Sequence, residues 1–413
     1  MSYKVAGIDI HKKVLMVVIA DAALAAEDWE WESRRFTTGA QERKHLVAWL
    51  QERGVAEIVM ESTAQYWKPV WLELEPHFGK LHLAQAHSNR APKGRKHDFG
   101  DAQRLTRRLV AGELMLSYVP GAEQRGWRTI TRAKWQLVRD RVRLQNQLEA
   151  LLEEARIKLS SVISELLGQS GRRILEALAE GQRDPAQLAA LGDFRLHCSQ
   201  SELADALNAP VGETHRQMLA LFLERLGLLD RQIQRLDYLA AEALKEHQDA
   251  VVRLAGVPGF GPDSAQRMIA ELGPRAATFP TPGELASWVG ICPGSNITAE
   301  VNGSTRCPKG NPFVRHLLTQ AAQAAVKKKG SIFQITFRRW LPKLTYNGAI
   351  WAIAHKLCRV VWKVLHDGVQ YIERGQETSP AVKRRRVQKM IRILREMGYK
   401  VEVAPLSPAT SAG

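Results

Sequence analysis

Four carboxylates in the first quarter of the chain stand where strands and helices are expected to begin or end. Asp9 lies in an apolar strand-like run, Glu61 ends a second such run, and Asp98 and Asp101 precede a helical pattern. Strand ends in an open α/β sheet gather at one edge, and a spacing of three places two residues on one side of a helix, so these side chains can converge. Clustered carboxylates repel one another unless Mg²⁺ or Mn²⁺, which prefer oxygen ligands, binds between them. A pair of such ions suits phosphodiester cleavage.

Taken singly, three of these carboxylates have a simpler structural explanation. Asp98 and Asp101 could cap a helix and favour its dipole, and Glu61 could lie beside a helix N-cap. Asp9 is different, because a charge inside an apolar strand is costly unless it is paired or bound to a metal. If these groups cut nucleic acid, the basic side chains just ahead of the helix would face backbone phosphates: Arg90, Lys93, Arg95 and Lys96.

The elements that would position the carboxylates alternate between strand and helix patterns over residues 1–121. Strands are predicted at residues 4–11, 14–20, 57–61 and 80–86, and helices at 40–53, 64–74 and 101–111. This alternation predicts an α/β domain around a mixed sheet, partly antiparallel because of the hairpin at its front.

The rest of the chain is predicted to be helical. Residues 122–249 have apolar spacings of three and four, typical of antiparallel helices in a coiled-coil arm, with an insertion at about 168–212. Such an arm serves most often as a spacer or a dimerisation device.

A third predicted domain covers residues 250–375 and begins with a glycine-rich turn. Gly259 and Gly261 precede a helix, as in a helix-hairpin-helix clamp on a DNA backbone, although a tight turn without a ligand fits equally well. Further helices are predicted at 282–289, 312–328 and 349–373, with a long loop from Cys292 to Asn311. Loops of this length are usually functional or disordered.

The tail, residues 376–413, contains the basic run KRRR at 383–386 on a predicted short helix and ends in a segment expected to be disordered. The run would either add affinity for nucleic acid or form a solvated helix.

Charge and composition favour a polyanionic partner. The chain has 59 Lys and Arg against 43 Asp and Glu, a formal net charge of +16. Its four cysteines include no CxxC pair, so neither a disulfide framework nor a structural zinc site is indicated. No secretory signal or membrane-spanning run is evident, and we expect a cytoplasmic protein without a membrane partner.

Ordered motifs in both halves of the chain together resemble one family. The first half contains GIDIHK at residues 7–12, MESTAQYW at 60–67 and KHDFGDA at 96–102. The second half contains GVPGFGP at 256–262, ASWVGICPG at 286–294 and KGN at 309–311, followed by Arg315. This set resembles the DEDD transposases of bacterial insertion sequences, the insertion-sequence one-ten family.

The resemblance implies a RuvC-like nuclease domain of the RNase H fold, in which Asp9, Glu61, Asp98 and Asp101 match the four acidic positions and would hold Mg²⁺. It also implies a recombinase that cuts and rejoins target and donor DNA, guided by a structured bridge RNA, in a homo-oligomer between a dimer and a tetramer, associated with the bacterial nucleoid. Residues of the C-terminal domain are expected to contact nucleic acid: Gly259, Gly261, Lys309 and Arg315.

In this family a serine of the C-terminal domain attacks the DNA phosphate and forms a covalent intermediate. Here the corresponding run is NITAE at residues 296–300, which places Thr298 at the serine position. A threonine has the same nucleophilic oxygen, but its methyl group restricts the rotamers. Thr298 is our preferred nucleophile, with Ser304 as the alternative and an impaired copy as the third possibility.

Two other functions fit the same residues. A junction nuclease of the RuvC type would cleave by activated water, without a covalent intermediate. A binding protein that has lost its chemistry would show salt-sensitive binding to RNA or DNA and no cleavage.

Overall fold

A computed structural model describes residues 2–61, 64–86, 99–293, 297–298, 301–302, 307–373, 380–396 and 400–402. The chain divides into two compact units, Met1–Gly121 and Ala122–Gly413. The division of the chain into a nuclease domain, an arm, a C-terminal domain and a tail stays a prediction.

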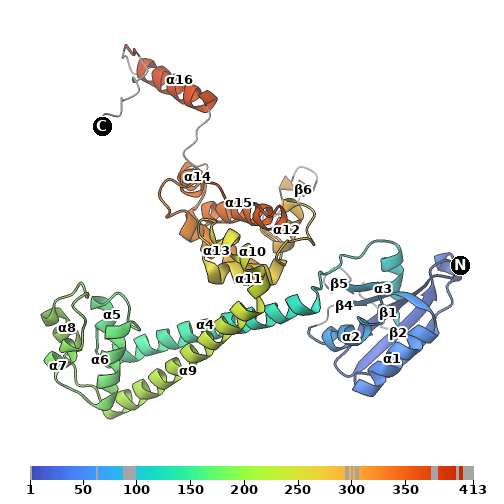
Figure 1. Cartoon of the computed structure of the whole chain (residues 1–413), viewed down its shortest axis with the longest axis horizontal. Helices are drawn as coiled ribbons and strands as arrows, with labels where there is room; N and C mark the ends of the chain where they lie inside the picture. Colours follow the sequence, from blue (N-terminus) through green and yellow to red (C-terminus); the bar gives the residue numbers. More distant parts are fainter. Residues whose placement is uncertain are drawn as a thin grey trace. The chain divides into compact units, whose positions relative to one another are not determined.

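The first unit is a five-stranded mixed sheet with helices on both faces (Figure 1). Its elements are β1 (Lys4–Ile10), β2 (Val14–Asp21), β3 (Glu32–Thr37), α1 (Ala40–Glu52), β4 (Val55–Glu61), α2 (Trp67–Leu74), β5 (Leu81–Ala84) and α3 (Gly100–Val110). The strand order is β3-β2-β1-β4-β5. β1 to β3 pair antiparallel, whereas β4 is parallel to both β1 and β5. This confirms the predicted mixed sheet and places β1 at its centre.

The two faces of β1 pack against different helices, because successive side chains of a strand point to opposite sides of the sheet. Ala6, Ile8 and Ile10 belong to the large apolar core that α1 and α2 cover. Gly7 and Asp9 point to the opposite face, which packs against α3. A much smaller apolar cluster on that face joins β4, β5 and α3. Asp9 therefore lies on the face of the sheet that has the smaller apolar cluster and is packed against α3.

β3 was not predicted from the sequence. All its residues except Phe36 are exposed, so it has no apolar pattern, and its strand geometry comes from pairing with the edge of β2. The predicted helix at 64–74 begins later, at Trp67, after Ala64 with a φ of +48°.

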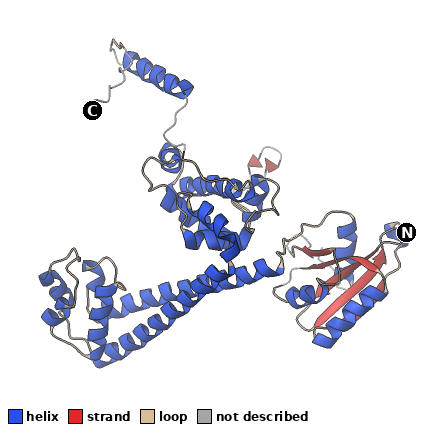
Figure 2. Ribbon diagram, in the orientation of Figure 1, coloured by secondary structure: helices blue, strands red, loops and turns tan. Residues whose placement is uncertain are grey.

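In the second unit, the long helices α4 (Ala122–Glu154) and α9 (Glu213–Ala243) run side by side (Figure 2). Four short helices at their far end share one apolar core with the ends of these two long helices: α5 (Leu159–Val162), α6 (Gln169–Glu180), α7 (Pro185–Ala190) and α8 (Gln200–Leu207). Long and short helices are therefore present where the sequence predicts the arm and its insertion, and the arm as a separate domain stays a prediction. A coiled-coil supercoil of the two helices stays a prediction.

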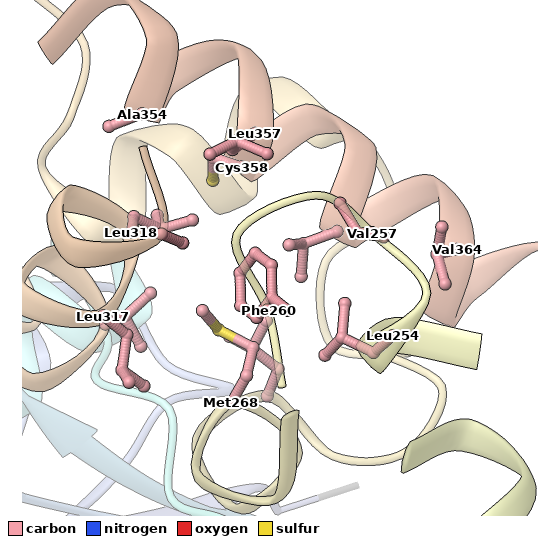
Figure 3. Packing of buried hydrophobic residues seen from close by; sticks show 14 of the residues in the cluster. Leu254, Val257, Phe260, Met268, Leu317, Leu318, Ala354, Leu357, Cys358 and Val364 are labelled. Carbon is pink, nitrogen blue, oxygen red and sulfur yellow. The ribbon is translucent and has the colours of Figure 1, made fainter. Parts of the chain in front are cut away.

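The helices from α10 to α15 enclose the largest apolar cluster among the described residues (Figure 3). They are α10 (Gln248–Ala255), α11 (Pro262–Leu272), α12 (Pro282–Val289), α13 (Pro312–Ala325), α14 (Ile332–Trp340) and α15 (Tyr346–His366). α14 was not predicted, and α15 begins and ends earlier than expected. The loop between α12 and α13 contains a short antiparallel pair, β6 (Ile297–Thr298) and β7 (Val301–Asn302).

The tail contains α16 (Pro380–Glu396), where the sequence predicts a short helix. Across the described part of the chain, no helix combines the length and the apolar character that crossing a membrane requires.

Candidate active site

Asp9 is a buried carboxylate on the central strand. The residue is only 8% exposed, and its carboxylate is paired with His11, whose Nε2 lies 3.1 Å from Oδ2. Burial raises the pKa of Asp9 above its ordinary value, the negative charges of Asp101 and Glu61 raise it further, and the neighbouring His11 lowers it. The strand therefore contains a charge whose environment is unfavourable without a cation.

Glu61 and Asp101 approach Asp9 for reasons set by the fold. In the parallel pairing of β1 with β4, Ile8 lies opposite Met60, so Asp9 and Glu61 follow side by side on the face toward α3. Asp101 lies in the first turn of α3, where its Oδ1 accepts a hydrogen bond from Arg104 Nη1 at 2.9 Å. Both carboxylates raise the pKa of Asp9, so each of them lies close enough to Asp9 for its charge to act there.

Gly7 allows α3 to lie directly on β1. A methyl group at this position would lie 2.3 Å from Thr106 Oγ1 and 2.4 Å from the carbonyl oxygen of Ala102. Thr106 is fully buried and donates a hydrogen bond to that same carbonyl oxygen. The missing side chain of Gly7 therefore fixes the height of α3 above the sheet, and with it the distance from Asp101 to Asp9.

The structure brings together three of the four predicted carboxylates. Asp98 lies outside the described residues, as do the basic residues predicted to face the phosphates: Arg90, Lys93, Arg95 and Lys96. Among the residues that the structure describes, no group of three or more His, Cys, Asp and Glu side chains meets the geometry of a metal centre. The buried Asp9 and the two carboxylates that act on it, Glu61 and Asp101, nevertheless suit a divalent cation in charge and donor type.

The loop predicted to supply the nucleophile begins and ends at a tight neck in the second unit. Thr298 is the last residue of β6 and pairs with Val301, while Ser304 lies outside the described residues. At the neck, a methyl group on Gly310 would lie 2.2 Å from the carbonyl oxygen of Val289. Only glycine permits this close backbone contact, so the KGN motif closes the loop.

Asn311 of the same motif is held from two sides. Its Oδ1 accepts from the backbone N–H groups of Phe313 and Val314 and caps α13, while its Nδ2 donates to Glu271 Oε2 at 2.9 Å. Glu271 is only 2% exposed and accepts two hydrogen bonds from Arg132 of α4, at 2.7 and 2.9 Å. The arm is thereby joined to the neck of the loop through one buried carboxylate.

Sequence reasoning missed Glu271, although the signal was the one that marked Asp9. It is an acidic residue within the otherwise apolar run MIAEL at residues 268–272. A buried charge in such a run requires a partner, and here the partners are arginines from a helix far away in the sequence.

The residues predicted to contact nucleic acid in the second unit differ in their local environments. Gly259 has a φ of +90° and packs its Cα against the carbonyl of Ala321, so a tight turn already explains it. The N–H of Gly261 donates to Ser264 Oγ at 2.8 Å. Lys309 is exposed, and the guanidinium of Arg315 lies over the ring of Trp351. A helix-hairpin-helix clamp stays a prediction.

Comparisons with known proteins identify the family. A family model for DEDD transposases of the IS110 type matches residues 6–157, and the model described as Transposase IS116/IS110/IS902 family matches residues 252–336. A Pseudomonas aeruginosa protein named as a probable family 20 transposase is 29% identical over 285 residues, which cover 66% of this chain and 73% of that protein. The transposase for insertion sequence element IS1111A of Coxiella burnetii is 23% identical over 371 residues, 88% of this chain and 89% of that protein.

The two matched segments together cover more than half of the chain, and they include both the carboxylate cluster and the neck of the loop. The resemblance seen in the motifs is therefore confirmed, and this chain belongs to the IS110 family of transposases, enzymes that cleave DNA strands and transfer them.

Proposed function

We propose that this transposase cuts DNA with Mg²⁺ held by Asp9, Glu61, Asp98 and Asp101, and that Thr298 provides the attacking hydroxyl. The observation that carries the metal site is the environment of Asp9: a carboxylate that is 8% exposed, with two further carboxylates raising its pKa. A buried carboxylate beside two others opposes folding unless a cation compensates for the negative charge, and clusters of this kind are typical of metal sites.

The bound metal would supply Lewis-acid stabilisation of the phosphate and of the leaving oxygen. The protein residues position it. β1 and β4 supply Asp9 and Glu61 from adjacent rigid strands, and α3 supplies Asp101, whose carboxylate Arg104 orients through one hydrogen bond. We propose that Asp98 completes the set, because it precedes α3 within the same KHDFGDA motif as Asp101.

The hydroxyl nucleophile is supported by the loop that contains it. Gly310 and Asn311 close the loop at its neck, and Glu271 and Arg132 fix Asn311. Both ends of the loop are thereby anchored in the second unit, and we propose that the loop presents Thr298 for in-line attack. A covalent bond between the enzyme and DNA would retain the phosphodiester energy and allow rejoining without ATP.

The proposal includes a structured bridge RNA that selects target and donor, and a homo-oligomer between a dimer and a tetramer. The net charge of +16 supports a second nucleic acid beside the DNA. Sequencing of RNA that copurifies with the protein from its native host, and light scattering of the complex, test these two parts. Copurifying RNA without any segment that maps next to the gene would contradict guidance by a bridge RNA.

The experiment that tests the metal site measures Mg²⁺-dependent cleavage of labelled DNA by the full chain. Asp9→Asn should abolish cleavage while DNA binding remains, whereas Glu27→Gln, an exposed acidic change in the same unit, should leave cleavage unchanged. Full activity of Asp9→Asn would reject the assignment.

A second experiment tests the nucleophile. On denaturing gels, labelled DNA should remain attached to the protein, and this attachment should be lost in Thr298→Ala but kept in Ser304→Ala. The reverse pattern would move the role to Ser304. Cleavage without trapped label would indicate hydrolysis by water, as in a junction nuclease, and binding without cleavage in any divalent metal would indicate an impaired copy.

A further inference from the structure

A basic groove lies beside the carboxylate cluster, at the turn between β1 and β2 and along the edge strand β3. It is shallow, with a volume of about 500 Å³, and its lining residues are His11, Lys12, Lys13, Val14, Met16 and Arg35. We propose that this basic groove binds the phosphates of the DNA strand that is cut at Asp9, with Arg35 as the principal contact. The proposal rests on the proposed function of the carboxylate cluster.

The strand pairing places Arg35 in line with Asp9. Asp9 lies opposite Met16 in the pairing of β1 with β2, and Met16 lies opposite Arg35 in the pairing of β2 with β3. Residues directly opposite each other point to the same face of a sheet. Arg35 is therefore two strands from Asp9 on the same face, a distance between strands of about 10 Å.

The row continues on the other side of Asp9 with Glu61. The face thus presents, in order across the sheet, one arginine, one methionine and two carboxylates. Met16 is only 7% exposed and forms an apolar floor between the positive and the negative ends of the row. A strand of DNA whose scissile phosphate lies at the carboxylates would have a neighbouring phosphate within reach of the arginine.

Arg35 differs from the other arginines of this unit in having no partner. Within the described residues, its exposed guanidinium has neither a hydrogen bond, an ion pair nor a ring contact, and the same holds for the side-chain amines of Lys12 and Lys13. Every other arginine described in the unit has such a partner: Arg34, Arg43, Arg53, Arg104, Arg107 and Arg108. Among the arginines that the structure describes in this unit, the one whose guanidinium is free to bind a ligand is therefore the one that lines the basic groove.

The chemistry of the lining favours phosphate. The basic groove contains two lysines, an arginine and a histidine, and no acidic residue contributes to its lining. A guanidinium on an edge strand can bind a phosphate through two parallel N–H groups, whereas lysines act as point charges. Because the basic groove lies next to Asp9, its expected ligand is the DNA strand to be cleaved and not a guide RNA.

The test uses a matched pair of variants on one strand. Arg34 and Arg35 are both exposed on β3 but point to opposite faces, because Arg34 lies over the rings of Phe36 and Trp49. Binding of the full chain to a fluorescein-labelled DNA duplex of mixed sequence, without Mg²⁺, is measured over a series of NaCl concentrations. Removing one phosphate contact should make the slope of log K against log[NaCl] shallower by about 0.9 and weaken binding about eightfold at 0.1 M salt.

We expect this change in Arg35→Ala and not in Arg34→Ala, while Arg35→Lys, which keeps the charge, should retain the wild-type slope. Arg35→Gln repeats the test if Arg35→Ala has a lowered melting temperature. An unchanged slope in Arg35→Ala, an equal change in Arg34→Ala, or a change seen with RNA of the same sequence but not with DNA would overturn the proposal.

Cleavage of the same DNA by Asp9→Asn separates this proposal from the proposed function. An unchanged slope in Arg35→Ala together with loss of cleavage in Asp9→Asn would reject the basic groove alone. A shallower slope together with full cleavage by Asp9→Asn would reject the carboxylate function and keep the basic groove as a site for DNA.

Discussion

Replacing Gly7 by alanine should separate the carboxylates without touching any of them. The new methyl group would lie 2.4 Å from the carbonyl oxygen of Ala102 and 2.3 Å from Thr106 Oγ1, whereas ordinary contacts begin near 3.4 Å. α3 must therefore move away from β1 by about 1 Å, because overpacked groups shift rather than overlap. Asp101 lies in the first turn of α3 and moves with it.

The expected effect is large for activity and moderate for stability. Overpacking of this kind costs about 1–3 kcal/mol of folding free energy. A displacement of about 1 Å at a catalytic group can lower the rate about 100-fold. The assay is Mg²⁺-dependent cleavage of labelled DNA, with thermal melting and circular dichroism to follow the fold. Gly79→Ala is the matched control, because a methyl group there meets nothing within 4 Å.

Two results would refute this reasoning. Wild-type cleavage by a folded Gly7→Ala would mean that the distance between Asp101 and Asp9 does not matter for the reaction. Equal loss of activity in Gly79→Ala would mean that the first unit is sensitive to any added side chain, and the close packing of α3 would then explain nothing.

Three further predictions concern stability and use thermal or chemical unfolding. Burial raises the pKa of Asp9, so the ionised carboxylate destabilises the fold above that pKa, and Asp9→Asn should raise the melting temperature at pH 7 in EDTA. This gain in melting temperature should disappear as the pH falls through the raised pKa of Asp9. A gain that is the same at all pH values would contradict the prediction. Arg132→Ala removes two hydrogen bonds from the buried Glu271, which keeps Arg128 and Asn311 as partners, and should cost about 2 kcal/mol. A cost below about 0.5 kcal/mol would show that the pair is effectively solvated. Gly259→Ala places a side chain at a backbone φ of +90° and against the carbonyl oxygen of Ala321, and should cost at least about 2 kcal/mol of folding free energy. Unchanged stability together with weaker DNA binding would instead favour a helix-hairpin-helix clamp on the DNA backbone.

The sequence was informative wherever a residue conflicted with its surroundings. Asp9 is a charge in an apolar strand, and this conflict by itself predicted a compensating site. The alternation of strand and helix patterns over residues 1–121, together with the hairpin at its front, likewise predicted the mixed sheet.

Other features could not be predicted because their cause lies far away in the sequence. β3 is polar and becomes a strand only by pairing with β2, so local propensity has nothing to detect. Gly7 precedes Asp9 by two residues, but its role depends on where α3 packs. The alignment of Arg35 with Asp9 follows from two strand registers together, and neither register can be read from the sequence.

Direct titration of the full chain with Mn²⁺ tests the central claim, that the carboxylates around Asp9 form a site for a divalent metal. Isothermal calorimetry, or electron paramagnetic resonance of free Mn²⁺, measures binding to wild type, Asp9→Asn and the exposed control Glu27→Gln. We expect binding to wild type and Glu27→Gln that is lost or strongly weakened in Asp9→Asn. Equal binding by all three proteins would contradict the claim.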